Sequence, residues 1–186
     1  MPFTTIANFA TWLTDQPENT AETAYTVKLN INDISDIKTT LIDSSDKYVY
    51  LDLSDSTIIS IPNYAFCKPI LVGNAIMGYE GSCTTLVGIN IPNSVTSIGQ
   101  HAFDGCTSLI SITIPNSVIS IGSRAFIDCT SLTSVTFQGT ITSDKLHSEA
   151  FNYNTWSIGD LREKYLAGGI GTYTRPNGDS KVWTKQ

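Results

Sequence analysis

Apolar residues recur along the middle of the chain with a short and a long period. In two adjacent stretches, 86–108 and 109–131, Ile or Val alternates with small polar residues and is then followed by proline. Alternation with a period of two predicts a half-buried β-strand, and proline ends it because it has no N–H for the ladder. The same 23-residue order then starts again, with 15 of 23 positions identical. Within it, Gly122 precedes the pair Ala125–Phe126, and we expect this glycine to adopt an unusual backbone angle.

Two further copies of the pattern flank the regular pair. A third copy opens at Leu132 and regains its Ala-Phe pair at 150–151, two positions late. An earlier, degenerate copy runs from Leu51 to Phe66, and an insertion, 67–83, separates it from the regular repeats. Because one copy cannot bury its apolar side alone, we expect about four stacked coils of a solenoid around a shared core.

The two ends of the chain have the patterns of covers for this core. The expected elements are a helix over 4–14 with Thr5 as its N-cap, a strand over 25–31, a helix over 34–42, a helix over 157–167 and a hairpin over 171–184. We expect Trp156 and Trp183 to pack over the last coil. The chain then divides into an N-terminal cap at 1–48, a repeat region at 49–137, and a last degenerate repeat with a C-terminal cap at 138–186.

The repeat, Leu-x-x-Ile-x-Ile-Pro-x-Ser-Val-x-x-Ile-Gly-x-x-Ala-Phe-x-x-Cys-x-Ser, resembles the BspA-type leucine-rich repeat. The resemblance is strong over 86–131 and partial over 49–66 and 132–151, so it covers about half of the chain. It implies an α/β fold: a leucine-rich-repeat solenoid with short parallel strands, an N-terminal α/β cap and a C-terminal helix-plus-hairpin cap. It also implies an extracellular or cell-surface bacterial protein with adhesin-like binding to host or matrix proteins, such as fibronectin and fibrinogen.

The charges of the chain are few and unevenly placed. Charged residues make up 15% of the sequence, and the formal net charge is -6. An acidic chain of this kind is a poor candidate for binding nucleic acid or an anionic membrane surface. No apolar run approaches the roughly 18 residues of a membrane span, and the first residues lack the pattern of a signal peptide. Residues 1–55 hold all of the net negative charge, and 56–186 sum to zero.

Three of the four cysteines, Cys83, Cys106 and Cys129, recur at the 23-residue interval. Equivalent positions in successive coils lie near one another, so disulfides between neighbours are geometrically conceivable. Cysteine is among the most frequently buried residue types, which favours a ladder of buried free thiols. Cys67 lies outside the regular repeats, and a Cys67–Cys83 disulfide that closes the insertion is the alternative. One thiol per coil does not provide four converging ligands, so we expect no metal site.

The sequence contains no recognisable catalytic or cofactor-binding arrangement. His101 and His147 are its only histidines, and His101 falls in a variable column that we expect to be exposed. A Gly-x-Ser-x-Gly elbow is absent. We therefore expect no enzymatic activity, no catalytic residue and no cofactor. A pocket that joins His147 to Asp144 or Glu149 would reopen the enzyme interpretation.

The candidate binding residues alternate with the core residues of the strands and are expected to line an exposed concave face. Aligning the strands of the four copies gives two columns across that face. They are Tyr50, Gly88, Ser111 and Ser134 in one column and Asp52, Asn90, Thr113 and Thr136 in the other. Apart from Tyr50 these side chains are small and polar, without the large anchors that dominate most interfaces. An inert, soluble sheet face therefore stays open as the alternative.

Two other segments compete as binding surfaces. The insertion is apolar for a loop, with Ile70, Leu71, Val72, Ile76, Met77 and Tyr79. It is either a binding loop or, in the interpretation we favour, an extra coil that covers the core. The C-terminal hairpin carries the anchor-type residues Tyr173, Arg175 and Trp183. We expect a monomer that binds a protein partner; the alternative is a purely structural or self-associating module without a host ligand.

Overall fold

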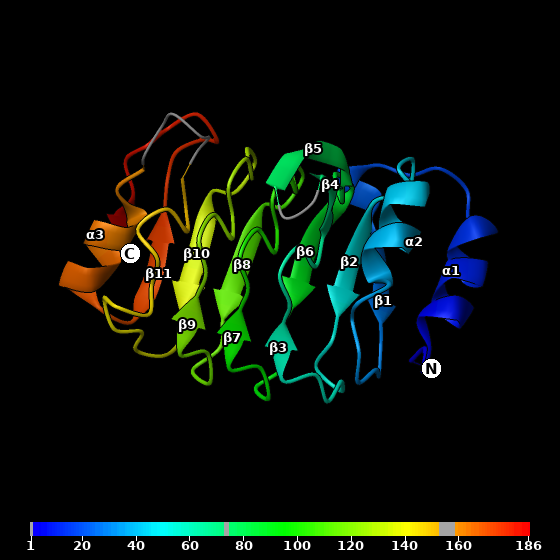
Figure 1. Cartoon of the computed structure of the whole chain (residues 1–186), viewed down its shortest axis with the longest axis horizontal. Helices are drawn as coiled ribbons and strands as arrows, with labels where there is room; N and C mark the ends of the chain where they lie inside the picture. The colour runs from blue at the N-terminus through cyan, green and yellow to red at the C-terminus, as the bar shows by residue number, and fades with distance from the viewer. Residues whose placement is uncertain (1, 73–74, 153–158) are drawn as a thin grey trace.

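The computed structural model describes residues 2–72, 75–152 and 159–186. These residues form an elongated body with two helices at one end and a third at the other (Figure 1). The helices are α1 (Ile6–Thr14), α2 (Ile37–Asp43) and α3 (Leu161–Gly168), with a short 3-10 helix at Ala21–Thr23. Between the ends, successive repeats lie side by side along the long axis.

The main sheet runs along the whole body, with its described strands in the order β1-β2-β6-β8-β10-β11-β12. The bounds are Tyr25–Lys28 for β1, Val49–Asp52 for β2, Leu86–Asn90 for β6, Ser111–Ile114 for β8, Ser134–Phe137 for β10, Gly171–Thr174 for β11 and Thr184–Lys185 for β12. The pairs from β1 to β10 are parallel, and the last two pairs are antiparallel. The predicted mixture of helix and strand and the predicted parallel stacking of short strands are confirmed.

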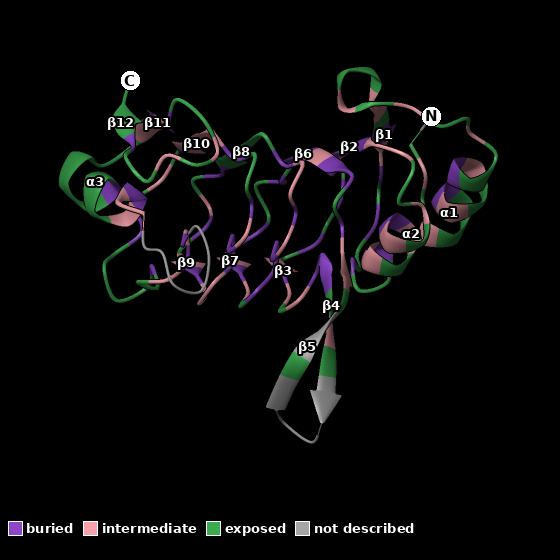
Figure 2. Cartoon of the chain, turned by 90° about the horizontal axis from the view of Figure 1, so that it is seen from above, coloured by how far each residue is buried: buried purple, intermediate pink, exposed green. Residues whose placement is uncertain are grey.

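A smaller sheet lies on the opposite side of the repeats (Figure 2). It consists of three parallel two-residue strands, β3 (Ser60–Ile61), β7 (Ser97–Ile98) and β9 (Ser120–Ile121). A turn that begins at proline connects the main sheet to the small sheet. After β8, Pro115 ends the strand, and its carbonyl accepts a hydrogen bond from Val118 N–H. The copies at 51–66, 86–108 and 109–131 each contribute one strand to each sheet, whereas the copy that opens at Leu132 adds β10 to the main sheet and meets the small sheet through a single bridge between Leu146 and Ile121. The core lies between the sheets.

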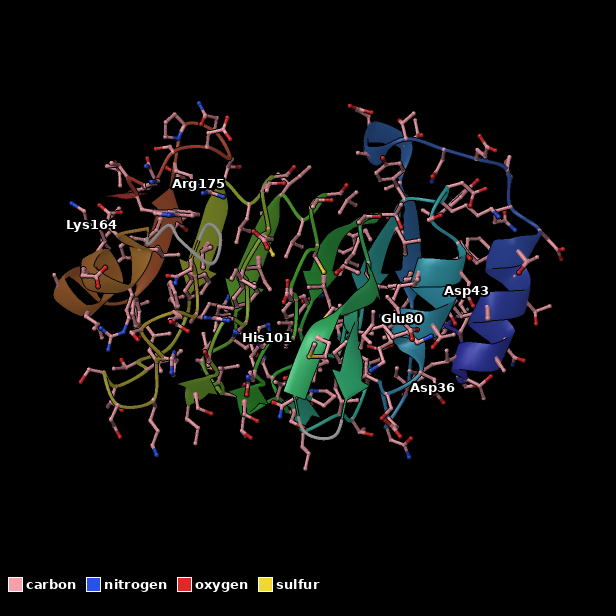
Figure 3. All side chains as sticks on the ribbon, turned by 45° about the horizontal axis from the view of Figure 1, so that its top comes forward. Asp36, Asp43, Glu80, His101, Lys164 and Arg175 are labelled. Carbon is pink, nitrogen blue, oxygen red and sulfur yellow. The ribbon has the colours of Figure 1, made fainter. Side chains whose placement is uncertain are left out.

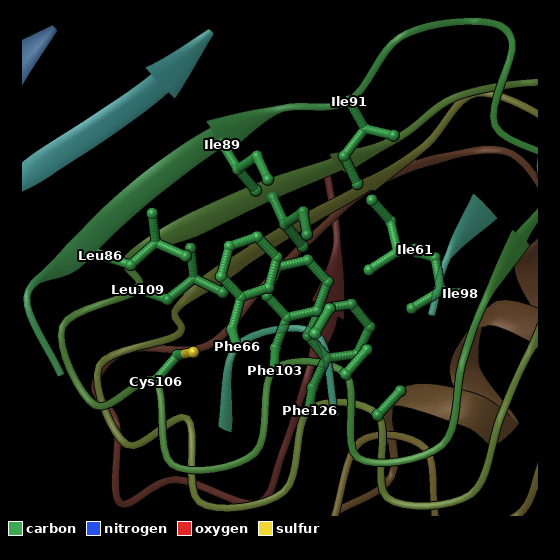
Figure 4. Packing of buried hydrophobic residues seen from close by; sticks show 14 of the residues in the cluster. Ile61, Phe66, Leu86, Ile89, Ile91, Ile98, Phe103, Cys106, Leu109 and Phe126 are labelled. Atoms are coloured by element: carbon green, nitrogen blue, oxygen red, sulfur yellow. The ribbon is translucent and has the colours of Figure 1, made fainter. Parts of the chain in front are cut away.

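Aromatic rings are stacked through the centre of that core. Phe66, Phe103, Phe126 and Phe151 come from four successive copies, and their ring centroids are 4.8, 5.0 and 4.8 Å apart. Figure 4 shows the first three rings beneath Ile89 of the main sheet. The stack reproduces the Ala-Phe alignment of the sequence, including the late pair at 150–151.

The predicted unusual backbone angle at Gly122 is wrong, although a glycine is needed there for another reason. Its φ is not positive; instead, a Cβ at this position would lie 2.6 Å from the backbone nitrogen of Gln100 in the preceding copy. Glycine is needed for close approach between copies. The left-handed backbone falls two positions later, at Arg124 (φ 54°), and at the equivalent residues Tyr64 (57°) and His101 (53°).

At the N-terminal end, α2 follows β1 and precedes β2 along the chain, as expected, and the two strands pair with each other in parallel. The Thr5 hydroxyl accepts a hydrogen bond from Asn8 N–H at 3.2 Å, which confirms the predicted N-cap of α1. The second helix starts at Ile37 rather than at 34, because the Asp33 carboxylate accepts the Ser35 N–H and forms a turn there.

The insertion is a hairpin and not an extra coil. Strands β4 (Cys67–Val72) and β5 (Ala75–Ser82) pair with each other in antiparallel fashion and project away from the body (Figure 2). The ion pair between Lys68 and Glu80, 2.5 Å, crosses the two strands. Ile70 and Met77 are exposed, as expected for a loop, whereas the side chains of residues 71–76, 78 and 79 lie outside the described residues.

The C-terminal end contains the predicted helix and hairpin in part. The described helix α3 begins at Leu161, and the expected start at 157, together with Trp156, lies outside the described residues. The hairpin pairs Thr174 with Thr184. Its supposed anchors are not offered to a partner: Tyr173, Arg175 and Trp183 are all buried against the last repeats. That part of the prediction is wrong, because these side chains attach the hairpin to the core.

Candidate partner-binding face

The strand register brings the predicted columns together. Tyr50 is opposite Gly88, Gly88 is opposite Ser111, and Ser111 is opposite Ser134. In the second column Asp52 is opposite Asn90, and Thr113 is opposite Thr136. The intervening residues, such as Ile112, are buried, so both columns lie on the outer side of the main sheet. We call this surface, formed by the outward side chains of β1 to β11, the main-sheet face.

Tyr50 is the large side chain among the predicted residues of this face, and it is 38% exposed. A Cβ on Gly88 would lie 2.7 Å from two atoms of the tyrosine ring. The ring therefore lies across the neighbouring strand in a space that only glycine leaves open. This arrangement presents an aromatic ring where a polar column would otherwise continue.

Asp52 is the charged member of the second column. Partial burial tends to raise its pKa, but hydrogen bonds from Ser54 and Asn90 and the nearby Lys28 ammonium outweigh burial, so the pKa of Asp52 lies below its usual value. Asn90 donates to the carboxylate at 3.0 Å, and Lys28 Nζ lies 3.9 Å from it and 3.0 Å from Asp55. One end of the face therefore carries fixed charges beside an aromatic ring.

The face is longer than the repeats predict. On β1, Thr26 and Lys28 are opposite Tyr50 and Asp52, and on β11, Thr174 and Thr172 are opposite Ser134 and Thr136. The Thr136 and Thr172 hydroxyls lie 2.9 Å apart and share a hydrogen bond. Sequence alignment of the repeats missed these residues, because they lie outside the repeat. The alternation within 25–31 and 171–174 was the signal that could have added them.

A cleft of about 420 Å³ adjoins the second column at the carboxyl ends of β6 and β8. It is lined by amide and hydroxyl side chains, among them Asn90, Asn93, Thr113 and Gln138. Carboxamides both donate and accept hydrogen bonds, so they suit peptide groups of a partner. The cleft adds a recess beside the second column in which a side chain of a partner can be held.

A groove on the opposite side does join His147 to Asp144. It measures about 540 Å³ and runs over the small sheet, with Lys145 beside the two residues. His147 Nδ1 accepts the backbone N–H of Glu149, whose carboxylate accepts hydrogen bonds from Ser123 and Arg124. Among the described residues, His147 makes no hydrogen bond to Asp144. The groove thus brings His147, Asp144 and Lys145 to one surface over the small sheet.

His101 is buried, contrary to the expected exposure. Its Nδ1 lies 2.7 Å from the Asp104 carboxylate, and its ring stacks on Tyr64 at 5.4 Å. Both members of the pair are buried. The equivalent residue in the next copy is Arg124, which pairs with Glu149. The side chain at this position of left-handed backbone therefore has a different acidic partner in each of the two copies. Buried polar pairs of this kind contribute to structure and offer no surface to a substrate.

All four cysteines are free thiols, and all are buried. The ladder of thiols is therefore confirmed, and the structure contains no Cys67–Cys83 bridge. Cys67 and Cys129 donate to the backbone carbonyls of His101 and Phe103, at 3.3 and 3.1 Å. In the described part of the chain no three His, Cys, Asp or Glu residues lie close enough to hold a metal ion.

We expect the thiols to be unreactive in the folded protein. Burial raises the pKa of Cys67 to about 12 and also holds the pKa values of the other three thiols above the usual value for cysteine, so little thiolate is present at neutral pH. Mass spectrometry after iodoacetamide treatment should find no alkylation in native protein and four alkylated cysteines in denatured protein. Rapid alkylation of native protein at any of them would contradict the buried ladder.

Comparison with known proteins adds one finding. Residues 78–164 match the family model of the BspA type leucine rich repeat region, in six copies. The match includes both 23-residue repeats and the third copy, and it starts after the degenerate copy at 51–66. The search of curated proteins found no match. None of the described helices has the length and apolar character needed to cross a membrane.

Proposed function

We propose that this protein is a non-catalytic protein-interaction module whose partner binds the main-sheet face, because residues 78–164 match the model of the BspA type leucine rich repeat region. The repeats form a solenoid that starts at residue 49 and ends near 137, with the hairpin at 67–83 as an insertion. Residues 1–48 act as its N-terminal cap, and residues 138–186 hold the last degenerate repeat and the C-terminal cap. Figures 1 and 2 support this division, since the helices lie at the two ends of the body.

The observation that carries the proposal is the continuity of the face. One column of outward side chains crosses five adjacent strands in register, from Tyr50 to Thr174. In the other column Asp52 is opposite Asn90, and Thr113, Thr136 and Thr172 are opposite one another. Continuous rows of hydroxyls and amides provide many hydrogen bonds, while Tyr50 provides an anchor-type residue. We infer that the partner is a host or matrix protein and that the module is displayed outside a bacterial cell, bound as a monomer.

We expect saturable binding of the purified chain to at least one immobilised host matrix protein, and loss of binding in the variant Asn90→Arg, Thr113→Arg, Thr136→Arg. Three arginines on one column would block contact with the face and weaken binding at least about tenfold, or 1.4 kcal/mol. Surface plasmon resonance against a panel that includes fibronectin and fibrinogen measures both.

The matched control places three arginines on a column of the small-sheet side: Ile59→Arg, Thr96→Arg and Ile119→Arg. These residues are exposed, and backbone hydrogen bonds connect them from copy to copy. The control should bind like the unmodified chain. Loss of binding in both variants would indicate a general charge effect, and binding kept by the first variant would move the site to the β4–β5 hairpin. Absence of binding to the whole panel would exclude the matrix-adhesin proposal.

A further inference from the structure

The loop of the C-terminal hairpin contains the one Asn-Gly pair of the sequence, Asn177–Gly178. In such a pair the backbone nitrogen of the second residue can attack the side-chain carbonyl carbon of the asparagine, and glycine has no Cβ to hinder the approach. Asn177 is exposed, so solvent water reaches its side chain. The loop therefore holds both reactants of a covalent change that needs only water in addition.

The folded loop holds the Asn177 side chain by two hydrogen bonds. Its Oδ1 accepts the backbone N–H of Asp179 at 3.1 Å and that of Ser180 at 3.0 Å, which makes an Asx turn. The attack would draw the side-chain carbon into a five-membered ring with the Gly178 nitrogen. We expect the rotation that this requires to break both hydrogen bonds, so the closed turn opposes the reaction.

The repeats fix Gly178 from the other side. A Cβ on this glycine would lie 1.6 Å from the backbone carbonyl oxygen of Thr130, which belongs to the copy at 109–131. The glycine backbone thus lies directly against that carbonyl. The peptide unit between Asn177 and Gly178 cannot turn freely while this contact is made, so we expect ring closure to require that the loop move away from the repeats.

Arg175 holds the loop against the repeats. Its guanidinium donates to the carbonyl of Ser180 within the loop, at 3.0 Å, and to those of Leu132 and Cys129 in the repeats, at 2.5 and 3.3 Å. Figure 3 shows Arg175 at the same end of the body as Lys164 of α3. Because these are charge-assisted hydrogen bonds of a buried side chain, we expect release of the loop to require their loss.

We propose that Asn177 is a site of spontaneous deamidation that becomes reactive only when the C-terminal hairpin detaches from the repeats. In the detached hairpin the Gly178 nitrogen loses its proton to water and bonds to Cγ of Asn177. The bond between Cγ and the side-chain nitrogen breaks, and that nitrogen takes up a proton and leaves as ammonia. Water then opens the cyclic imide at either carbonyl, which gives aspartate or isoaspartate in place of Asn177. In sum, water is consumed and ammonia is released, with no change of oxidation state.

The two products differ in whether the loop can close again. Aspartate keeps the main chain as it was, and its carboxylate can accept the N–H groups of Asp179 and Ser180 as the amide oxygen does. In isoaspartate the main chain runs through the former side chain and gains a methylene before Gly178. We expect this longer loop to lose the fit of Gly178 against Thr130, so the hairpin stays detached.

This inference goes beyond the proposed binding function and does not depend on it. The hairpin supplies β11 and β12, the last strands of the main sheet. Detachment therefore removes Thr172 and Thr174 from the main-sheet face. Isoaspartate at this position records, in covalent form, that the C-terminal end of the sheet has opened.

Deamidation of the full chain at mildly alkaline pH, followed by mass spectrometry of the peptide that contains Asn177, tests the proposal. The rate in native buffer should be at least about tenfold below the rate in urea, which corresponds to an opening free energy of at least about 1.4 kcal/mol. Arg175→Ala should raise the native rate about tenfold toward the rate in urea. Arg162→Ala, which removes an arginine that also donates to backbone carbonyls at this end, should leave the native rate unchanged.

Each of these results has an opposite that would overturn the proposal. Equal rates in native buffer and in urea would show that the folded loop does not oppose the reaction. An unchanged native rate in Arg175→Ala, or an equal rise in both arginine variants, would exclude detachment of the hairpin as the controlling step. Hydrogen exchange of Arg175→Ala should show loss of protection in 171–186 while the repeats stay protected. Loss in both would assign a faster rate to general unfolding, contrary to the proposal.

The two products are tested separately. Asn177→Asp supplies the aspartate product directly, and its region 171–186 should be as protected from hydrogen exchange as in the unmodified chain. The isoaspartate form, separated from aged protein by chromatography, should have lost this protection. Equal protection in the isoaspartate form would overturn the inferred loss of fit. Lost protection in Asn177→Asp would also overturn it, because the added charge rather than the longer main chain would then open the loop.

Discussion

Replacement of Phe103 with alanine is expected to lower the free energy of unfolding by about 3–5 kcal/mol. Phe103 is fully buried at the middle of the aromatic stack, with Phe66 at 4.8 Å on one side and Phe126 at 5.0 Å on the other. Its removal leaves a cavity that the flanking rings cannot fill, because the backbones of neighbouring copies are held together by the ladders of both sheets. The loss of two ring contacts adds to the cost.

Urea unfolding followed by far-ultraviolet circular dichroism measures this difference. Phe103→Leu keeps most of the volume and should cost less than about 1.5 kcal/mol, and Ile119→Ala, at a 60% exposed position, should stay within about 0.5 kcal/mol. A small loss in Phe103→Ala, equal to that in Ile119→Ala, would contradict the stacked core. A second transition in the variant would show that the copies unfold separately on either side of the cavity.

The repeated part of the fold could be predicted well because each copy tests the same pattern again. The spacing of Phe103 and Phe126 in the sequence predicts their stacking, and the alignment of Gly88 with Ser111 predicts their pairing. Two copies that must bury the same face leave only one register, since a slip of one residue would turn every apolar side chain outward. The candidate face follows from the same register.

Features without a second copy were the ones that the sequence could not decide. The apolar residues of 67–83 suit either a binding loop or an extra coil, and only the structure shows the hairpin in which Cys67 pairs with Ser82. Burial of His101 was missed because a polar residue in a variable column suggests the surface. Its partner Asp104 exists in that copy alone, where the next copy has Ile127.

The sequence also does not decide whether a charged anchor-type residue binds a partner or attaches one part of the chain to another. An arginine between aromatic residues, as at 173–183, is typical of binding surfaces and also of buried attachments. Which of these two roles an arginine has depends on whether nearby backbone carbonyls lack other hydrogen-bond partners. A sequence does not show this. Arg175 is the side chain in which this ambiguity has the largest energetic consequence.

Arg175→Ala should detach the C-terminal hairpin and lower the free energy of unfolding by about 3 kcal/mol. The guanidinium is buried and donates to the carbonyls of Leu132 and Cys129, at 2.5 and 3.3 Å, and it lies 5.0 Å from the Trp183 ring. Truncation leaves these carbonyls buried beside a gap. Arg175→Lys should rescue only part of the loss, because one ammonium cannot reproduce the planar fork that reaches several carbonyls.

Hydrogen exchange measured by mass spectrometry locates the effect, and the region 171–186 should lose protection before the repeats do. Arg162→Ala is the matched control: Arg162 also donates to two carbonyls, those of Leu146 and Ser143, but at a partly exposed site. Water can replace its hydrogen bonds, so the control should cost only about 1 kcal/mol. Equal costs in Arg175→Ala and Arg162→Ala would contradict a buried attachment. If exchange in 171–186 stayed unchanged, the hairpin would be held by Tyr173 and Trp183 alone, and the extended main-sheet face would not depend on Arg175.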